Sequence, residues 1–158
     1  MTGTGLAASP SYNRSLNVLF VCFGNACRSQ MAEAFANRLG EGRIRAWSAG
    51  SHPLGYIIED TRAVLREKGV LIDGQFSKGL KDVPMEQMDV IVTMGCEVNC
   101  PLPAGFKGRV TEWNVPDPFA HGLDFFRNVR DLIARQVREL VEELQPASRA
   151  SGLRKFTR

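Results

Sequence analysis

The sequence predicts an α/β layer fold with a mostly parallel sheet. Short apolar runs alternate along the chain with longer segments in which apolar residues recur at helical spacing. The first run, Leu16–Val21, leads into a glycine-containing turn and then into the amphipathic stretch Gln30–Leu39. A buried strand, a tight turn and a helix in this order are typical of a parallel sheet.

Each further element has a signal of its own. Gly40 follows the first helical stretch and is expected to end it as a C-cap. Asp89–Met94 is a clear central strand, Arg109–Asn114 is polar enough for an edge strand, and Leu123–Leu144 carries the longest apolar stripe. The predicted elements are, in order, strand 16–21, helix 30–39, strand 44–47 (ended by Ser48-Ala49-Gly50), helix 57–68, strand 89–94, strand 109–114 and helix 123–144.

The 158 residues suit one domain with a core of its own, over residues 16–144. We expect a disordered head at 1–15 and a basic, flexible tail at 145–158. The net charge of +3 is weak evidence for nucleic-acid binding, because the tail holds four basic residues and no acidic one. No apolar run reaches the ~18 residues of a membrane helix, and no signal-peptide core is present. We therefore expect a cytoplasmic monomer that binds neither nucleic acid nor membranes.

The turn after the first strand holds a cysteine and an arginine five residues apart, Cys22 and Arg28. If the loop wraps around an anion, its backbone N–H groups point inward, and Gly24 is expected to supply the positive φ that this needs. The next helix begins near Arg28, which directs its positive dipole end and a bidentate guanidinium at the same point. The candidate oxyanion-binding residues are Phe23, Gly24, Asn25, Ala26, Cys27 and Arg28.

This environment favours a thiolate at Cys22, and a thiolate is a ready nucleophile. Ser29 can donate a hydrogen bond to its sulfur, and Asn25 can hold the loop through side-chain bonds to the backbone. The plainer alternative is a buried cysteine in a β–α turn with an unrelated arginine nearby. A nucleotide-binding loop of the Walker type is excluded, because its glycine-lysine pattern is absent.

These residues carry a family resemblance. The run Cys22–Ser29, the Ser48-Ala49-Gly50 segment and the pair Asp117-Pro118 resemble the low-molecular-weight protein tyrosine phosphatases. The resemblance implies a three-layer α/β/α fold with a four-stranded sheet, and Asp117 as the general acid that protonates the leaving oxygen. Phosphatases of this family usually have proline after the Arg-Ser pair, whereas Arg28–Glu33 reads Arg-Ser-Gln-Met-Ala-Glu, as in the arsenate reductase branch.

A second cysteine pair, Cys96 and Cys100, follows the strand 89–94. Parallel strands end at the same sheet edge, so this pair is expected beside the Cys22 loop. The reductase resemblance implies that Cys96 attacks the sulfur of a Cys22–arsenate adduct, which releases arsenite, and that Cys100 takes the disulfide to the surface for thioredoxin. Only three residues separate the pair, fewer than in the thioredoxin-coupled pattern, so glutathione with glutaredoxin, or mycothiol, is the alternative reductant.

Other interpretations of the same residues remain open. Cys96 and Cys100 could be small loop residues, and the four cysteines, Cys27 included, could form a zinc site in a non-catalytic regulator. Cys27 alone suits core packing, and Asp117 could lie in a solvated turn. The alternative enzyme is a phosphatase acting on phosphotyrosine or aryl phosphates, although Phe119 is the one aromatic residue directly after Asp117-Pro118.

Some reductases of this branch bind a potassium ion near the loop. Asn25, Glu33 and Ser48 stand at the matching positions, and their oxygen atoms suit a hard cation. The alternative is that Glu33 lies on the helix surface.

Overall fold

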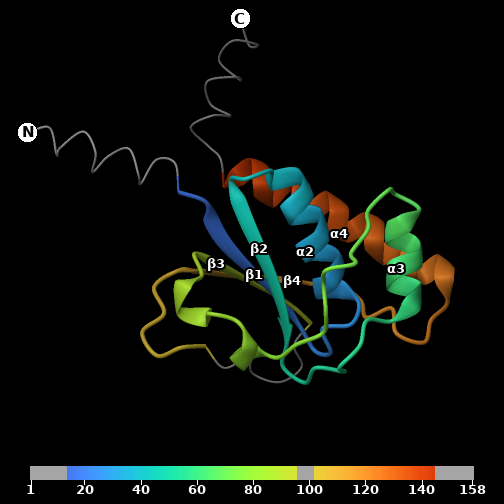
Figure 1. The fold of residues 1–158 in the computed structure, drawn as a ribbon, viewed down its shortest axis with the longest axis horizontal. Helices are drawn as coiled ribbons and strands as arrows, with labels where there is room; N and C mark the ends of the chain where they lie inside the picture. Colours follow the sequence, from blue (N-terminus) through green and yellow to red (C-terminus); the bar gives the residue numbers. More distant parts are fainter. Residues whose placement is uncertain (1–13, 96–101, 145–158) are drawn as a thin grey trace, which may run out of the picture.

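The computed structural model describes residues 14–95 and 102–144, and its fold is that of one parallel sheet covered by helices. The sheet has the order β2-β1-β3-β4, and every neighbouring pair is parallel (Figure 1). The predicted fold class is confirmed, as is the edge position of the polar strand. The strands are β1 (Leu16–Cys22), β2 (Ile44–Gly50), β3 (Val90–Met94) and β4 (Arg109–Trp113).

The two faces of the sheet are covered unequally. The helices α2 (Arg28–Gly40), α3 (Glu59–Arg66) and α4 (Leu123–Glu143) gather on one face, where alternate β1 residues such as Val18 and Phe20 join the larger core (Figure 1). The intervening residues Leu19 and Val21 join a smaller core under the short 3-10 helices η1 (Leu80–Asp82) and η2 (Met85–Gln87). The alternation follows from the two-residue period of a strand.

Several element boundaries differ from the predictions by one to three residues, and three of these differences have a cause in the structure. Helix α3 begins at Glu59 because Ile58 is extended and donates its N–H to the carbonyl of Ala26 at 3.2 Å. Gly40 lies inside α2, and Glu41 adopts the left-handed C-cap with φ 35°. Gly40 serves close packing instead, since a Cβ there would lie 2.7 Å from Cβ of Ile44.

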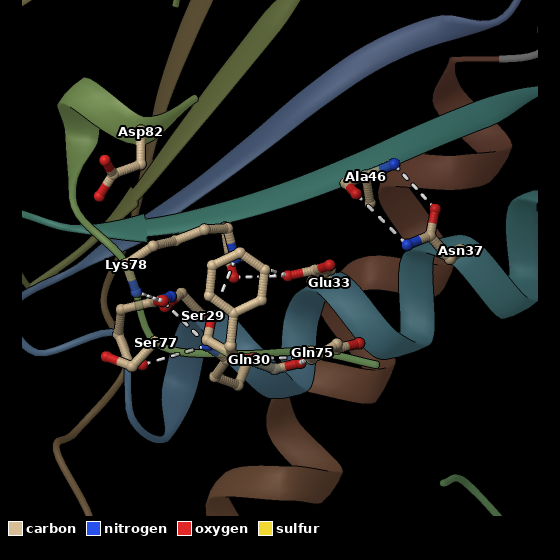
Figure 2. A network of polar contacts seen from close by, with 12 residues as sticks. Ser29, Gln30, Glu33, Asn37, Ala46, Gln75, Ser77, Lys78 and Asp82 are labelled. Carbon is tan, nitrogen blue, oxygen red and sulfur yellow. Dashed lines mark hydrogen bonds and ion pairs between the residues drawn. The ribbon is translucent and has the colours of Figure 1, made fainter. Parts of the chain in front are cut away.

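The third difference is that β2 continues through Gly50, which pairs with Cys22 at the end of β1. The outer edge of β2 is covered from α2, because the side-chain amide of Asn37 accepts from the N–H of Ala46 and donates to its carbonyl (Figure 2). The predicted head and tail lie outside the described residues, apart from Arg14 and Ser15. Arg14 forms an ion pair with Asp89.

None of the helices in the described part of the chain combines the length and the hydropathy that a bilayer crossing requires.

Candidate active site

The loop between β1 and α2 turns its carbonyl groups outward. The segment after β2 supplies most of the donors: Ser51, His52 and Leu54 give their N–H groups to the carbonyls of residues 22, 23 and 24 at 2.8 to 3.1 Å. Thr61 donates its hydroxyl to the carbonyl of Ala26. Within the described residues no hydrogen bond donated by the amides of residues 23–27 is found. The loop therefore presents free N–H groups to its interior, as an anion nest does.

The residue with left-handed backbone in this loop is Asn25, with φ 49°, and not Gly24. The expectation for Gly24 was therefore wrong. Asparagine tolerates this conformation better than other residues with a side chain, and its amide is used as well. The nearby glycine with a steric role is Gly50, because a Cβ there would meet the carbonyl oxygen of Phe23 at 2.7 Å.

Ser29 holds the thiol of Cys22. Its Oγ lies 3.0 Å from the sulfur, and it also accepts a hydrogen bond of 2.7 Å from Nδ2 of Asn25. Since an amide NH₂ only donates, the single hydroxyl proton of Ser29 is left free to be donated to the sulfur. All three side chains are buried. This arrangement supports a negative charge on Cys22.

Arg28 is buried and aimed across the mouth of the loop. Its Nη1 donates to the carbonyls of Met94 and Val115, at 3.0 and 3.2 Å, which fixes the guanidinium plane. Its Nε finds no partner among the residues that the structure describes. A buried N–H without an acceptor, next to loop amides without acceptors, fits a tetrahedral oxyanion. Gly95 has φ 66° and must be glycine, because a Cβ would lie 2.6 Å from Nη1.

Asp117 lines a cavity together with Cys22 and Arg28. Its carboxylate lies 3.6 Å from Nη2 of Arg28, accepts the N–H of Phe119 and is half exposed. The cavity has a volume of about 220 Å³ and reaches both Cys22 and Asp117. Apolar side chains form much of its wall: Phe23, Ala26, Leu54, Ile58 and Phe119. The carboxylate of Asp117 and the thiol of Cys22, the candidate proton donor and the candidate nucleophile, therefore line one small, partly apolar cavity.

The segment Gln75–Lys78 also belongs to the site, and the sequence patterns did not reveal it. The hydroxyl of Ser77 donates to the carbonyl of Gly24, and the backbone N–H of Lys78 donates to Oδ1 of Asn25 at 2.8 Å. Figure 2 shows Gln75 meeting Gln30 beside the first turn of α2, with Lys78 and Glu33 close by. This segment lies in neither a helix nor a strand and has no motif, so only the residues it contacts identify it.

Glu33, one of the three candidate potassium ligands, already has a cation beside it. Ser48 donates to the carboxylate of Glu33, and the ammonium of Lys78 lies 3.8 Å from the same oxygen and donates to the carbonyl of Phe76 (Figure 2). Burial raises the pKa of Glu33, while Ser48 and Lys78 lower it. Burial likewise lowers the pKa of Lys78, against the charge of Glu33. The cluster thus resembles a closed ion pair more than an open site for potassium.

The remaining cysteines divide into two groups. Cys27 is buried in the core, and burial raises the pKa of its thiol to about 12, so it stays protonated and inert. Cys96 and Cys100 lie outside the described residues. In the described ranges no group of three or more His, Cys, Asp or Glu side chains could hold a metal ion.

A cysteine and an arginine on a loop with inward-facing N–H groups, at the carboxyl edge of a parallel sheet, are the arrangement typical of the cysteine-dependent phosphatase class. A family model agrees: residues 17–150 match "low molecular weight phosphotyrosine protein phosphatase". The chain belongs to this family.

Relatives within the family include both reductases and phosphatases. The chain is 35% identical to a glutaredoxin arsenate reductase of Synechocystis, over 80% of this chain and 97% of the relative. It is 34% identical to the low-molecular-weight protein-tyrosine-phosphatase YfkJ of Bacillus subtilis, over 82% and 96%.

Solved structures with this fold include arsenate reductases. An arsenate reductase in its phosphate-binding state aligns with a TM-score of 0.73 at 34% identity, over 81% of this chain and 98% of that one. A thioredoxin-dependent arsenate reductase of Corynebacterium glutamicum aligns with a TM-score of 0.72 at 29% identity, over 90% and 73%. The predicted family is confirmed.

Proposed function

We propose that this protein is an arsenate reductase, with Cys22 as the nucleophile, Arg28 as the oxyanion clamp, Ser29 as the thiolate donor and Asp117 as the general acid. The observation that carries the choice is Gln30, at the position where the phosphatases usually have proline. Gln30 is fully buried and donates to Oδ1 of Asn25 at 2.9 Å and to the carbonyl of Phe76 at 3.0 Å. Proline has no side-chain donor for these two hydrogen bonds. The glutamine that is typical of the reductase branch therefore has a structural role in this site.

The first step joins sulfur to arsenic. The thiolate of Cys22 attacks arsenate, the arsenic–oxygen bond to the leaving oxygen breaks, and Asp117 protonates that oxygen so that it departs as water. Loop amides and Arg28 hold the remaining oxygens. Helix α2 begins at Arg28 and directs its positive dipole end to the same point.

The second step is the reduction. The thiolate of Cys96 attacks the sulfur of Cys22, a disulfide forms, and the electron pair of the sulfur–arsenic bond stays on arsenic, which leaves as arsenite. The two thiols are oxidised by two electrons and arsenic is reduced by two. Cys100 then exchanges with this disulfide and passes it to an external thiol. The relatives named above suggest glutaredoxin with glutathione, or thioredoxin, and mycothiol is the third candidate.

The second candidate activity is hydrolysis of an aryl phosphate. The apolar wall formed by Leu54, Ile58 and Phe119 favours it, since arsenate itself gains nothing from apolar contacts. Water in place of Cys96 would then attack the Cys22 adduct. We expect this phosphate hydrolysis as a side activity, because the relative YfkJ is named as a phosphatase.

The deciding experiment compares two activities in three proteins: wild type, Cys96→Ser and Cys22→Ser. Arsenite release is measured with thioredoxin, with glutaredoxin and glutathione, and with mycothiol, and p-nitrophenyl phosphate reports hydrolysis. Cys22→Ser is expected to lose both activities, and Cys96→Ser to lose arsenate reduction alone. No arsenite with any reductant, or arsenate reduction unchanged in Cys96→Ser, would contradict the proposal.

The positive charge near the loop is proposed to come from Lys78 in place of a potassium ion. Its ammonium already lies beside the carboxylate of Glu33, with both side chains largely buried. A potassium ion would need to displace it or to share one carboxylate with it.

A further inference from the structure

A chain of side-chain amides runs from Gln75 to the nucleophile. Nε2 of Gln75 donates to Oε1 of Gln30 at 2.7 Å, and Nε2 of Gln30 donates to Oδ1 of Asn25 at 2.9 Å (Figure 2). Asn25 in turn donates to Ser29, and Ser29 reaches the sulfur of Cys22. Every donor in this series points toward the thiol.

The direction of the series is fixed by atoms outside it. Oδ1 of Asn25 also accepts the backbone N–H of Lys78, so its NH₂ must face Ser29. Nε2 of Gln30 also donates to two carbonyls, those of Asn25 and Phe76, so its oxygen must face Gln75. Neither amide can turn over without placing a carbonyl oxygen against other acceptors. Only Gln75 supplies a side-chain donor to Gln30 Oε1 within the described part of the chain.

We propose that Gln75 is a positioning residue for the Cys22 thiolate, acting through Gln30, Asn25 and Ser29. Aligned hydrogen bonds polarise one another in a low-dielectric interior, so a donor at the far end strengthens the last bond, from Ser29 to sulfur. Loss of that donor leaves the buried oxygen of Gln30 without its partner, which frees the Gln30 and Asn25 amides to reorient. The proton of Ser29 then no longer points at the sulfur.

The inference deepens the proposed function, because it concerns the nucleophile of that reaction, but its main test does not require arsenate. Gln75→Met removes the donor and keeps the volume, and Gln75→Glu replaces the donor by an acceptor at the same place. Gln87 is exposed, and no hydrogen bond or ion pair of its side chain is found in the described residues, so Gln87→Met and Gln87→Glu are matched controls. Arg28 and Asp117 across the cavity, and Lys78 with Glu33 beside Asn25, are unchanged in every variant.

The first readout is the pH profile of alkylation at Cys22 by iodoacetamide, followed by tandem mass spectrometry on the tryptic peptide 15–28. Both Gln75 variants are expected to move the profile upward by about half a pH unit or more and to lower kcat for p-nitrophenyl phosphate about 3- to 10-fold, with KM little changed. The Gln87 variants are expected to match wild type. A lowered melting temperature with an unmoved profile makes Gln75 merely structural and overturns the proposal.

A second readout uses the unaltered residue and so does not depend on a variant folding. In ¹⁵N-labelled wild-type protein, the side-chain NH₂ resonances of Gln75 and Gln30 are expected to shift with the same midpoint as Cys22 alkylation. In Cys22→Ser this shift is expected to vanish. Resonances that ignore the ionisation of Cys22 overturn the proposal. If alkylation and resonances respond but no arsenite forms, the relay stands and the reductase assignment fails.

Discussion

The ammonium of Lys78 lies 3.8 Å from the carboxylate of Glu33, and their side chains are only 10% and 14% exposed. Lys78→Met removes the charge, keeps the apolar stem and leaves the buried carboxylate of Glu33 with the hydrogen bond from Ser48 but without the cation beside it. Removal of one partner of a buried ion pair is strongly destabilising. We expect a loss of about 2 kcal/mol in unfolding free energy by urea titration. Lys81→Met, at an exposed lysine of η1, is the control and is expected to change little.

The same pair predicts the response to potassium. Because Lys78 already supplies a cation, wild-type arsenate reduction is expected to be equal in KCl and in NaCl of the same concentration. Steady-state kinetics in the two salts measure this. A clear activation by potassium in the wild type would show that the Glu33 cluster takes the ion in spite of Lys78.

Gly95 is expected to tolerate no side chain. Its φ of 66° and the Cβ approach of 2.6 Å to Nη1 of Arg28 predict that Gly95→Ala displaces the guanidinium. We expect a loss of about 1–3 kcal/mol in stability together with most oxyanion binding, measured by calorimetric titration with phosphate. Gly74→Ala is the control, since a Cβ at Gly74 meets nothing within 4 Å. Equal behaviour of the two variants would refute this account of Gly95.

Asp117→Asn tests the general acid. An amide donates no proton to the leaving oxygen, so kcat is expected to fall ~10²-fold or more. The fall should be larger for phenyl phosphate than for p-nitrophenyl phosphate, because the better leaving group needs less protonation. Asp73→Asn, at an exposed aspartate, is the control. A loss that is independent of the leaving group would assign Asp117 a role in orienting Arg28 only.

Glu67 predicts an acid-dependent link between α3 and α4. Hydrogen bonds from Arg127 and Arg130 lower the pKa of Glu67 from 4.5 to about 2. A carboxyl group with a depressed pKa stabilises the fold above its unfolded pKa and loses that effect as pH falls toward the folded pKa. The melting temperature of wild type should therefore exceed that of Glu67→Gln at neutral pH, and the difference should shrink between about pH 4.5 and 2. Glu142→Gln is the exposed control.

The strands and the thiol loop could be predicted because their signals are local. The apolar run before Cys22, the spacing to Arg28 and the stripe of α4 each depend on neighbours in sequence. The predicted boundaries were wrong where a contact distant in sequence determines the backbone conformation. At Ile58, for example, the N–H donates to the carbonyl of Ala26, and α3 begins only after this residue. Periodicity carries no information about such a contact.

The supporting half of the site could not be predicted for the same reason. Gln75 and Lys78 lie about fifty residues from the loop they hold, in a segment without periodicity or motif. The sequence predicts that the Asn25 side chain holds the loop, but it favours Gly24 for the left-handed backbone that the structure places at Asn25. Glycine is the residue usually expected at a positive φ. Here the adjacent asparagine adopts that conformation, and its side chain also donates a hydrogen bond to Ser29.

The outward carbonyls of the loop have a consequence for selectivity. A cradle held open by residues 51–58 and lined with N–H groups recognises four oxygens around a centre, and phosphate has the same shape and charge as arsenate. Phosphate is therefore expected to compete with arsenate for this site. In the mechanism proposed above, discrimination then falls to Cys96, since its attack on the sulfur of Cys22 expels trivalent arsenic readily, whereas phosphorus has no comparably stable trivalent product. The enzyme would tell its substrate from phosphate by whether it can be reduced.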